Sequence, residues 1–139
     1  MKIAVSACLL GVNCRYNGKA KGYKKILDLA KNNTLIPVCP EQLAGLPTPR
    51  EAAENLGENV VTKSGKNLTS EFKKGATEAL RLIQITGCKK VILKERSPSC
   101  GSHKVYDGTF SNSLRDGNGV FAKLLKQNNI EVLSEEDLN

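Results

Sequence analysis

The chain has 139 residues, 40% of them hydrophobic, which predicts one domain spanning residues 1–139 around a single buried core. The net charge of +7, from 21 Lys and Arg against 14 Asp and Glu, favours an anionic partner, but three Phe, three Tyr and no Trp offer little stacking surface for nucleic-acid bases. The chain shows no export signal and no run of about 18 apolar residues, so we expect a cytoplasmic protein without a membrane partner.

Strand and helix patterns alternate along the chain, with no internal repeat and no low-complexity segment. The predicted elements are a strand at 2–7, a helix at 23–33, a strand at 34–39, a helix at 69–87, a strand at 89–94, a hairpin at 104–111, a helix at 119–129 and a strand at 130–134. The helix at 69–87 is expected to begin with a Thr or Ser cap and to end at Gly87. Asp107 and Gly108 predict a tight hairpin turn. This order predicts an α/β fold, in which right-handed crossovers build a parallel sheet covered by helices.

Five cysteines in a chain without an export signal are poor candidates for structural disulfides, because cytosolic thiols are kept reduced. Three of them, Cys8, Cys39 and Cys100, each follow a predicted strand. The carboxyl ends of parallel strands line one edge of the sheet, and ligands bind there near the point where strand order reverses. We therefore expect these three thiols to converge at one metal-binding or reactive site.

The other two cysteines have different positions. Cys88 precedes the strand at 89–94, at the opposite edge of the sheet, so we interpret it as structural. Cys14 lies in the loop after Cys8 and can reach the same site, where it is either a fourth ligand or a bystander. The single histidine, His103, is expected to face solvent or to support the hairpin rather than to bind metal.

Three widely separated cysteines favour an iron–sulfur cluster over a structural zinc site. Structural zinc takes four ligands, commonly supplied by cysteine pairs with two to four intervening residues, and the chain contains no such pair. A four-iron cluster with three cysteine ligands leaves one iron open to a substrate, and an open coordination position is what a catalytic metal centre needs.

Four blocks of the sequence carry a resemblance to a known family. They are "SACLLGVNCRYNG" (6–18), "CPEQLAGLPTPR" (39–50), "ERSPSCG" (95–101) and "GNGVFAKLL" (117–125). In this order, and over nearly the whole chain, they resemble the small bacterial thiouracil desulfidase (TudS) family. The chain departs from the family pattern at Ala44, where a Gly-Gly pair is usual, and at Asn17, where Asp is frequent. These departures bear on substrate preference rather than on the cluster.

The resemblance implies a single Rossmann-like domain, with a mainly parallel sheet, helices on both faces and a small β-hairpin near the C-terminus. It implies a [4Fe-4S] cluster held by Cys8, Cys39 and Cys100, whose fourth iron takes the sulfur of a thiolated pyrimidine while water supplies the replacing oxygen. This exchange needs no net redox change. The resemblance places the catalytic roles on Glu41 and Ser97.

The residues around the cysteines suit this chemistry, although each has a plainer interpretation. A carboxylate two residues past a ligand can activate water or move a proton, so Glu41 is either the general acid–base or a surface cap of a short helix. Ser99 either orients the substrate or forms a turn. Arg50 either binds an anionic substrate or pairs with Glu41. We expect Arg15 and Tyr16 at the edge of the substrate pocket.

Two other functions stay open at this point. In one, Cys14 completes a closed four-thiolate site in a non-enzymatic metal-binding or redox module. In the other, the charge of +7 serves a small domain that binds thiolated tRNA, although the scarcity of aromatic residues disfavours it. The sequence is compatible with a monomer and with a homodimer.

Overall fold

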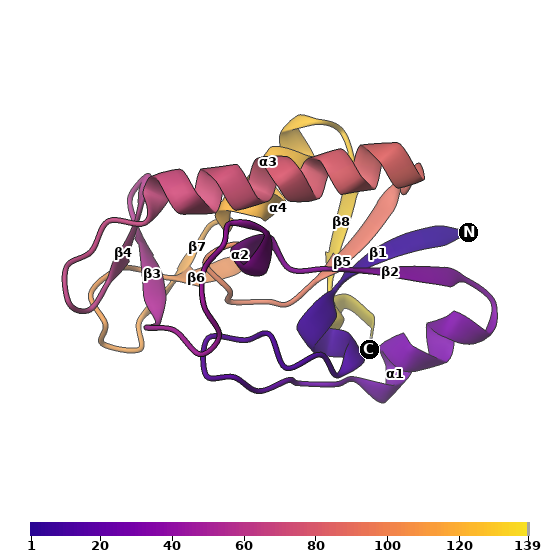
Figure 1. The fold of residues 1–139 in the computed structure, drawn as a ribbon, viewed down its shortest axis with the longest axis horizontal. Helices are drawn as coiled ribbons and strands as arrows, with labels where there is room; N and C mark the ends of the chain where they lie inside the picture. Colours follow the sequence, from indigo (N-terminus) through magenta and orange to yellow (C-terminus); the bar gives the residue numbers. More distant parts are fainter. Residues whose placement is uncertain (139) are drawn as a thin grey trace.

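A four-stranded parallel sheet forms the centre of the computed structural model, which describes residues 1–138 (Figure 1). The strands, in spatial order, are β2 (Thr34–Val38), β1 (Lys2–Ser6), β5 (Lys90–Leu93) and β8 (Glu131–Ser134). The two central strands, β1 and β5, are almost wholly buried, since helices cover both of their faces. The predicted α/β fold with a mainly parallel sheet is therefore confirmed.

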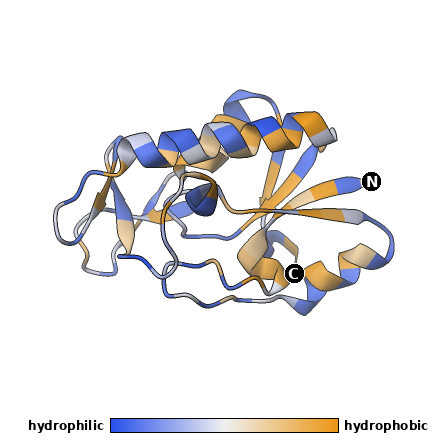
Figure 2. Cartoon of the chain, in the orientation of Figure 1, coloured by the Kyte–Doolittle hydropathy of each residue, from blue (hydrophilic) through white to orange (hydrophobic). Residues whose placement is uncertain are grey.

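Helices lie on both faces of this sheet. The long helix α3 (Thr69–Thr86) and α4 (Val120–Gln127) cover one face, where Ile83, Phe121 and Leu125 are fully buried. The other face is covered by α1 (Lys24–Asp28) and three 3-10 segments, η1 (Ala7–Leu10), η2 (Leu29–Lys31) and η3 (Glu135–Leu138). Figure 2 shows hydrophilic and hydrophobic bands alternating along α3, as in an amphipathic helix, and shows the central strands as largely hydrophobic.

Two antiparallel hairpins and a short helix complete the fold at the carboxyl edge of the sheet. The hairpins are β3 (Ala53–Leu56) with β4 (Asn59–Thr62), and β6 (Lys104–Tyr106) with β7 (Leu114–Asp116). The short helix α2 (Pro40–Leu43) lies against α3, as Figure 1 shows. Gly75 permits this approach, because a Cβ atom at that position would overlap the carbonyl group of Pro40.

The predicted strands and the two longer helices agree with the structure to within one or two residues, and Gly87 ends α3 in the left-handed conformation, with φ 74°. The predicted hydroxyl cap of α3 is wrong. Leu68 occupies the N-cap position without a side-chain hydrogen bond. The Thr69 hydroxyl instead accepts the N–H of Val60 at 2.9 Å and donates to Asn67 at 2.6 Å, so it fastens α3 to β4.

Other segments also differ from expectation. The helix expected at 23–33 is divided into α1 and η2. The hairpin near the C-terminus exists, but residues 107–113 form a wide loop rather than a tight two-residue turn. The reason is a contact with β3, because the N–H groups of Gly108 and Phe110 both donate to the Glu54 carboxylate. Residues 40–68, for which no strand was expected, contain α2 and the β3–β4 hairpin.

No helix among residues 1–138 combines the length and the apolar character that crossing a membrane requires.

Candidate functional site

A cavity of about 450 Å³ opens at the carboxyl edge of the sheet, and four of the five cysteines line it. Cys8 follows β1, Cys39 follows β2 and Cys100 lies in the loop after β5. The chain leaves β1 for β2 on one side and reaches β5 on the other, so the cavity lies where the strand order reverses. Cys8, Cys39 and Cys100 thus line one cavity, as expected, and Cys14 lines it with them.

The first two cysteines of the cavity lie where a strand passes into a short helical segment. Cys8 lies in η1, which ends at Gly11 with φ 98°, a left-handed conformation that favours glycine. The carbonyl oxygen of Cys8 accepts the N–H of Lys21 at 3.0 Å, which folds the intervening loop back over the turn. Cys39 has extended backbone and is the N-cap residue of α2, whose first residue is Pro40.

The thiols of Cys8, Cys14 and Cys39 are close neighbours. Cys39 Sγ lies 4.0 Å from the Cys14 carbonyl oxygen. The nearby Cys39 thiol lowers the pKa of Cys14, but the nearby Cys8 thiol and burial outweigh this effect and raise that pKa to about 11. The Cys14 thiol and burial raise the pKa of Cys39 even further. Binding of a metal by these groups as thiolates therefore displaces protons.

The third thiol is held by a serine-rich turn. Burial raises the pKa of Cys100 to about 12, while hydrogen bonds from the hydroxyls of Ser6 and Ser99 lower it. Ser97 Oγ accepts the backbone N–H groups of Ser99 and Cys100 at 3.2 and 3.0 Å, which closes the turn around Pro98. Although its neighbours in the sequence are polar, Cys100 is thus buried in a turn formed by Ser97 and Ser99.

The helix α4 begins directly behind this turn. The carbonyl oxygen of Ser99 accepts the N–H of Phe121 at 2.8 Å, and that of Pro98 accepts the N–H of Val120 at 3.0 Å, so the turn caps the helix. Gly119 allows the contact, because a Cβ atom there would lie 2.5 Å from the carbonyl carbon of Ser99. The block at 117–125 is therefore a support for the Cys100 turn.

A buried carboxylate anchors the same segment from its other side. Glu95 Oε1 accepts the backbone N–H groups of Ser102, His103 and Lys104 at 3.0 to 3.1 Å, and of Arg96 at 3.3 Å. Burial raises the pKa of Glu95, but these N–H donors lower it by more, and the net pKa is below the ordinary value. The ionised carboxylate holds the chain in a closed loop around Cys100.

Glu41 is the centre of a polar network beside the thiols. Arg50 Nε donates to Glu41 Oε1 at 3.1 Å, and the two side chains are 8% and 14% exposed. The Ser99 hydroxyl donates to Glu41 Oε2 at 2.7 Å. Arg50 Nη2 also donates to the Cys14 carbonyl oxygen at 2.9 Å. Of the two interpretations left open for Arg50, the ion pair is the one that the structure contains.

The serines form a chain that ends at this carboxylate. Ser97 Oγ lies 3.1 Å from Ser99 Oγ. The Ser99 hydroxyl has two acceptors, Glu41 Oε2 at 2.7 Å and Cys100 Sγ at 3.6 Å. With its single proton on the nearer acceptor, the proton between the two serines comes from Ser97. Ser97, Ser99 and Glu41 are thus linked in series, with Ser99 in the middle. Of the two serines, Ser99 is the one that contacts the carboxylate, across 58 positions of sequence.

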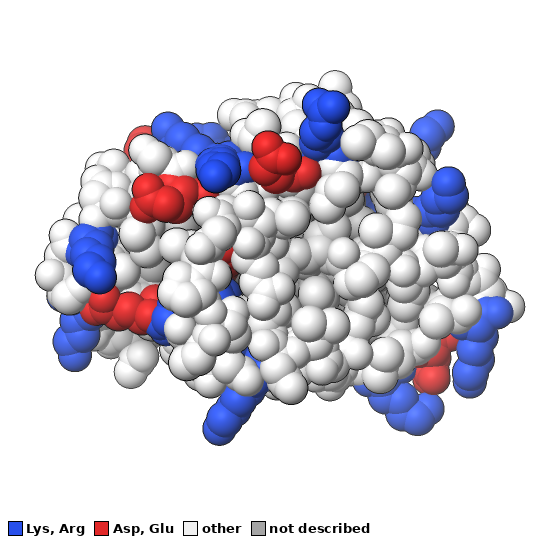
Figure 3. Space-filling view, viewed as in Figure 1, with Lys and Arg blue, Asp and Glu red and all other residues white. Residues whose placement is uncertain are grey.

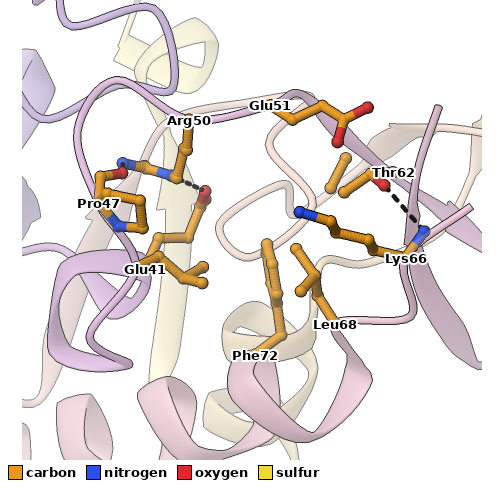
Figure 4. A pocket seen from close by; sticks show the side chains of 10 residues that line it. Glu41, Pro47, Arg50, Glu51, Thr62, Lys66, Leu68 and Phe72 are labelled. Atoms are coloured by element: carbon orange, nitrogen blue, oxygen red, sulfur yellow. Dashed lines mark hydrogen bonds and ion pairs between the residues drawn. The ribbon is translucent and has the colours of Figure 1, made fainter. Parts of the chain in front are cut away.

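Glu41 and Arg50 also line a second cavity of about 160 Å³, which Figure 4 shows from close by. Leu68 and Phe72, from the start of α3, supply apolar wall to this smaller cavity, and Lys66 lies across it (Figure 4). Since the Glu41–Arg50 pair belongs to the lining of both cavities, it is a wall shared between them.

Arg15 and Tyr16 line the larger cavity, as expected, with the Arg15 guanidinium 5.9 Å from the centre of the Tyr16 ring. Tyr16 is 44% exposed, which leaves its ring free at the mouth. Sequence reasoning missed further lining residues that the hairpins and the Cys100 loop supply. These are Glu54, Lys63, Lys94, Arg96, Tyr106 and Phe110. The pair Gly57–Glu58 between two β-prone stretches was the one signal for the first hairpin.

The remaining predictions concern residues away from the cavity. Cys88 is buried in the core under α3 and α4, with its sulfur 3.3 Å from the Thr86 hydroxyl, which agrees with a structural role. His103 is half-exposed and pairs with Asp137 at 3.0 Å, so it joins the second hairpin to η3.

The chemistry of the donor set fits an iron–sulfur group. The cavity offers soft thiols from three strand ends, with hydroxyl hydrogen-bond donors beside Cys100, and thiolates are the ligands that hold iron–sulfur clusters. Among residues 1–138, no three His, Cys, Asp or Glu side chains are already gathered as a site for a metal ion.

The sequence profile of the 2-thiouracil desulfurase family matches residues 3–137. A Bacillus subtilis (strain 168) protein described as "Uncharacterized protein YbbK" is 43% identical over 147 aligned positions, which cover 99% of this chain and 97% of that protein. A solved structure described as "[4Fe-4S]-dependent thiouracil desulfidase TudS (DUF523Vcz)" superimposes with a TM-score of 0.93 at 46% identity. The match covers 99% of this chain and 92% of that one.

Proposed function

The chain belongs to the 2-thiouracil desulfurase family, and on this premise we propose that it is an iron–sulfur enzyme that converts the thiocarbonyl of a thiolated pyrimidine to a carbonyl. The observation that carries the proposal is the meeting of Cys8, Cys39, Cys100 and Glu41 in one cavity at the reversal point of the sheet. These are the residues on which the resemblance places the ligands and the catalytic carboxylate.

Cys8, Cys39 and Cys100 would hold the [4Fe-4S] group. When bound, a cluster with three thiolate ligands supplies a soft Lewis-acidic iron, which polarises a C=S bond. In the overall exchange, the carbon–sulfur double bond is replaced by a carbon–oxygen double bond, water provides the oxygen, and hydrogen sulfide leaves with the two protons. Neither carbon nor sulfur changes oxidation state.

Glu41 is the group of this chain that moves protons. Arg50 fixes one carboxylate oxygen and Ser99 the other, so the carboxylate plane cannot rotate freely and its free lone pairs keep a set direction. Such a carboxylate can take a proton from the attacking water and return it to the leaving sulfur, help that is typically worth ~10²–10⁴-fold in rate. The buried Arg50 keeps the ionised form compensated.

Ser97 and Ser99 divide the serine role between them. Ser97 is the outer member of the hydrogen-bonded series and the less buried of the two, so it is placed to meet the substrate. Ser99 links Ser97 to the Glu41 carboxylate through two consecutive hydrogen bonds, and the negative charge of the carboxylate polarises both hydroxyl groups. The exposed ring of Tyr16 offers a face for stacking on a pyrimidine, with Arg15 beside it at the rim.

The test is anaerobic reconstitution with iron and sulfide, followed by an assay of 2-thiouracil conversion to uracil with release of sulfide. We expect the visible absorbance of a four-iron cluster and turnover together, and the loss of both in Cys8→Ala, Cys39→Ala and Cys100→Ala. Cys88→Ala is the matched control, because that thiol lies in the core away from the cavity. A colourless protein that binds zinc and never turns over would contradict the proposal.

Cys14 gives a specific reason to test a second function, a closed four-thiolate metal or redox site. Its thiol lines the same cavity as the other three. In that case Cys14→Ser loses metal while the protein stays folded, and the wild type shows no desulfidase activity. The thio-tRNA-binding alternative has less support, since Figure 3 shows Lys and Arg dispersed over this face, with acidic side chains between them.

A further inference from the structure

Lys94 is a largely buried cation in the wall of the larger cavity, and the proposed chemistry does not yet use it. Its side chain is 12% exposed. It follows β5 directly, and its N–H donates to Ser6 Oγ at 2.9 Å, which joins it to the end of β1. Cys8 lies two residues after Ser6, and Cys100 lies six residues after Lys94. The cation therefore belongs to the same sheet edge as two of the proposed ligands.

Two acceptors hold the ammonium group of Lys94 in place. It donates to the Glu95 carbonyl oxygen at 2.9 Å and lies 3.2 Å from Glu135 Oε2. The Glu135 side chain is 1% exposed, and its other oxygen accepts the N–H of Glu95 at 2.7 Å. Because Leu93 and Ser134 are paired in the sheet, the two charged residues that follow them meet across adjacent strands. The carboxylate is thus fixed and compensates the buried positive charge.

The ammonium group keeps one hydrogen-bond donor for a ligand. It has three N–H groups, and among residues 1–138 its acceptors are the Glu95 carbonyl oxygen and the Glu135 carboxylate. Arg50, the other cation of this wall in a buried ion pair, differs in this respect. Each of its three side-chain nitrogens already donates to an acceptor of the chain.

A purely structural role explains the Lys94–Glu135 pair poorly. A buried ion pair contributes little net stability, because the cost of removing both charges from water offsets their attraction. A cation in a cavity wall with an unused N–H is instead suited to bind an oxygen atom. Besides its thiocarbonyl, a pyrimidine such as 2-thiouracil carries one ring carbonyl, whose oxygen is such an acceptor.

Building on the proposed function, we propose that Lys94 binds the ring carbonyl oxygen of the thiolated pyrimidine, with its ammonium group held in place by Glu135. The hydrogen bond fixes the orientation of the ring in the cavity. It also draws the lone pair of the intervening ring nitrogen toward the carbonyl and away from the thiocarbonyl, whose carbon becomes more open to attack by water. The contact strengthens as negative charge grows on the oxygen, so it favours the transition state over the bound substrate.

The experiment compares two substrates of the reconstituted holoenzyme, 2-thiouracil and pyrimidine-2-thione, which lacks the ring carbonyl. Lys94→Met keeps the length of the side chain and removes the ammonium group. We expect its kcat/KM for 2-thiouracil to fall roughly 10–100-fold, as for the loss of a hydrogen bond to a charged group. Its kcat/KM for pyrimidine-2-thione and its iron content should stay at the wild-type values.

Lys104→Met is the matched control. Lys104 belongs to the same segment of the chain, but it pairs with Asp116 at 2.6 Å and is not part of the cavity lining. This variant should treat both substrates as the wild type does. Equal losses on both substrates in Lys94→Met would give Lys94 a structural role, and kinetics equal to those of Lys104→Met would remove it from the site. Either result would overturn the inference.

Two further measurements keep the test decisive. If Lys94→Met does not fold because Glu135 is left unpaired, the double variant Lys94→Met with Glu135→Gln takes its place, since it removes both charges. If the wild type does not turn over pyrimidine-2-thione, competitive inhibition by uracil is compared with inhibition by pyrimidin-2-one, which lacks the same carbonyl. Weaker inhibition by uracil alone supports the inference, and equal weakening contradicts it. Failure of the proposed function is recognised separately, as a wild type without cluster or turnover.

Discussion

Ser99 links three parts of the site: the Glu41 carboxylate, the Ser97 hydroxyl and the start of α4. Its hydroxyl donates to Glu41 at 2.7 Å and accepts from Ser97, its N–H is bound by Ser97, and its carbonyl oxygen caps α4. The sequence suggested two roles for it, contact with the substrate or simple turn formation. The structure adds a third, contact with the carboxylate, because α2 brings Glu41 to the Cys100 turn.

Replacing Ser99 by alanine should lower kcat by about 10²-fold, since Glu41 loses one of the two bonds that orient it and Ser97 loses its connection to the carboxylate. Steady-state kinetics with 2-thiouracil measure the effect, and iron content shows that the cluster is retained. Ser102→Ala is the matched control, because the Ser102 hydroxyl is buried in the same loop and has no partner among residues 1–138. Equal activity in the two variants would remove Ser99 from the mechanism.

At the scale of the element, the loop from Glu95 to Lys104 depends on a single carboxylate. Four backbone N–H groups share Glu95 Oε1, and the pKa of Glu95 is below its ordinary value of 4.5. In the unfolded chain this carboxyl binds its proton at higher pH than in the folded protein. Its contribution to stability is therefore complete above about pH 5 and is lost as the pH falls through the lowered folded pKa.

We expect Glu95→Gln to reduce the free energy of unfolding at neutral pH by roughly 1–3 kcal/mol, because a neutral amide is a weaker acceptor for buried donors. The same change should flatten the acid limb of the stability curve below about pH 5. Denaturant unfolding between pH 3 and pH 7 measures both effects. Glu78→Gln, on the exposed side of α3, serves as the control and should leave the curve as in the wild type.

The packing of α2 on α3 leads to a second prediction at this scale. Alanine is favoured over glycine in a helix by ~1 kcal/mol, yet Gly75→Ala should destabilise the protein by roughly 1–3 kcal/mol, since the added methyl group meets the Pro40 carbonyl group. Displacement of α2 also moves Glu41, so activity should fall with stability. Thr77→Ala, at an exposed position of α3, should leave the melting temperature nearly unchanged. If the Gly75→Ala protein were as stable as Thr77→Ala, α2 would be able to move away from the added methyl group at no cost in stability, and the prediction would be wrong.

At the scale of the whole molecule, the hydrophobic pattern of the sequence predicted the strands of the parallel sheet and their order along the chain. Runs such as "KIAVSA" and "KKVILK" are buried strands, and their order implied that Cys8, Cys39 and Cys100 lie at one edge. The sequence could not show which side chains from the hairpins enclose the cavity. Glu54 and Phe110 reach it through a contact between β3 and the loop after β6, and no local pattern encodes such a pairing.

If the chain forms a single domain, as its length predicts, it should unfold in one cooperative transition. The two core clusters lie on opposite faces of the same sheet, so loss of the sheet removes both at once. Far-ultraviolet and near-ultraviolet circular dichroism should therefore give the same midpoint in urea. Transitions that separate would mean that the hairpin end of the molecule unfolds independently of the sheet.

The three proposed ligands come from strand ends that lie up to 92 positions apart in the sequence, and nothing but the finished sheet brings them together. The order of assembly follows from this arrangement. Unlike a zinc finger, in which the metal organises the chain, this polypeptide has to fold before a cluster can be inserted. The cluster would thus be inserted into an already folded apoprotein. A chelator could remove it, and it could be supplied again, while the apoprotein stays folded.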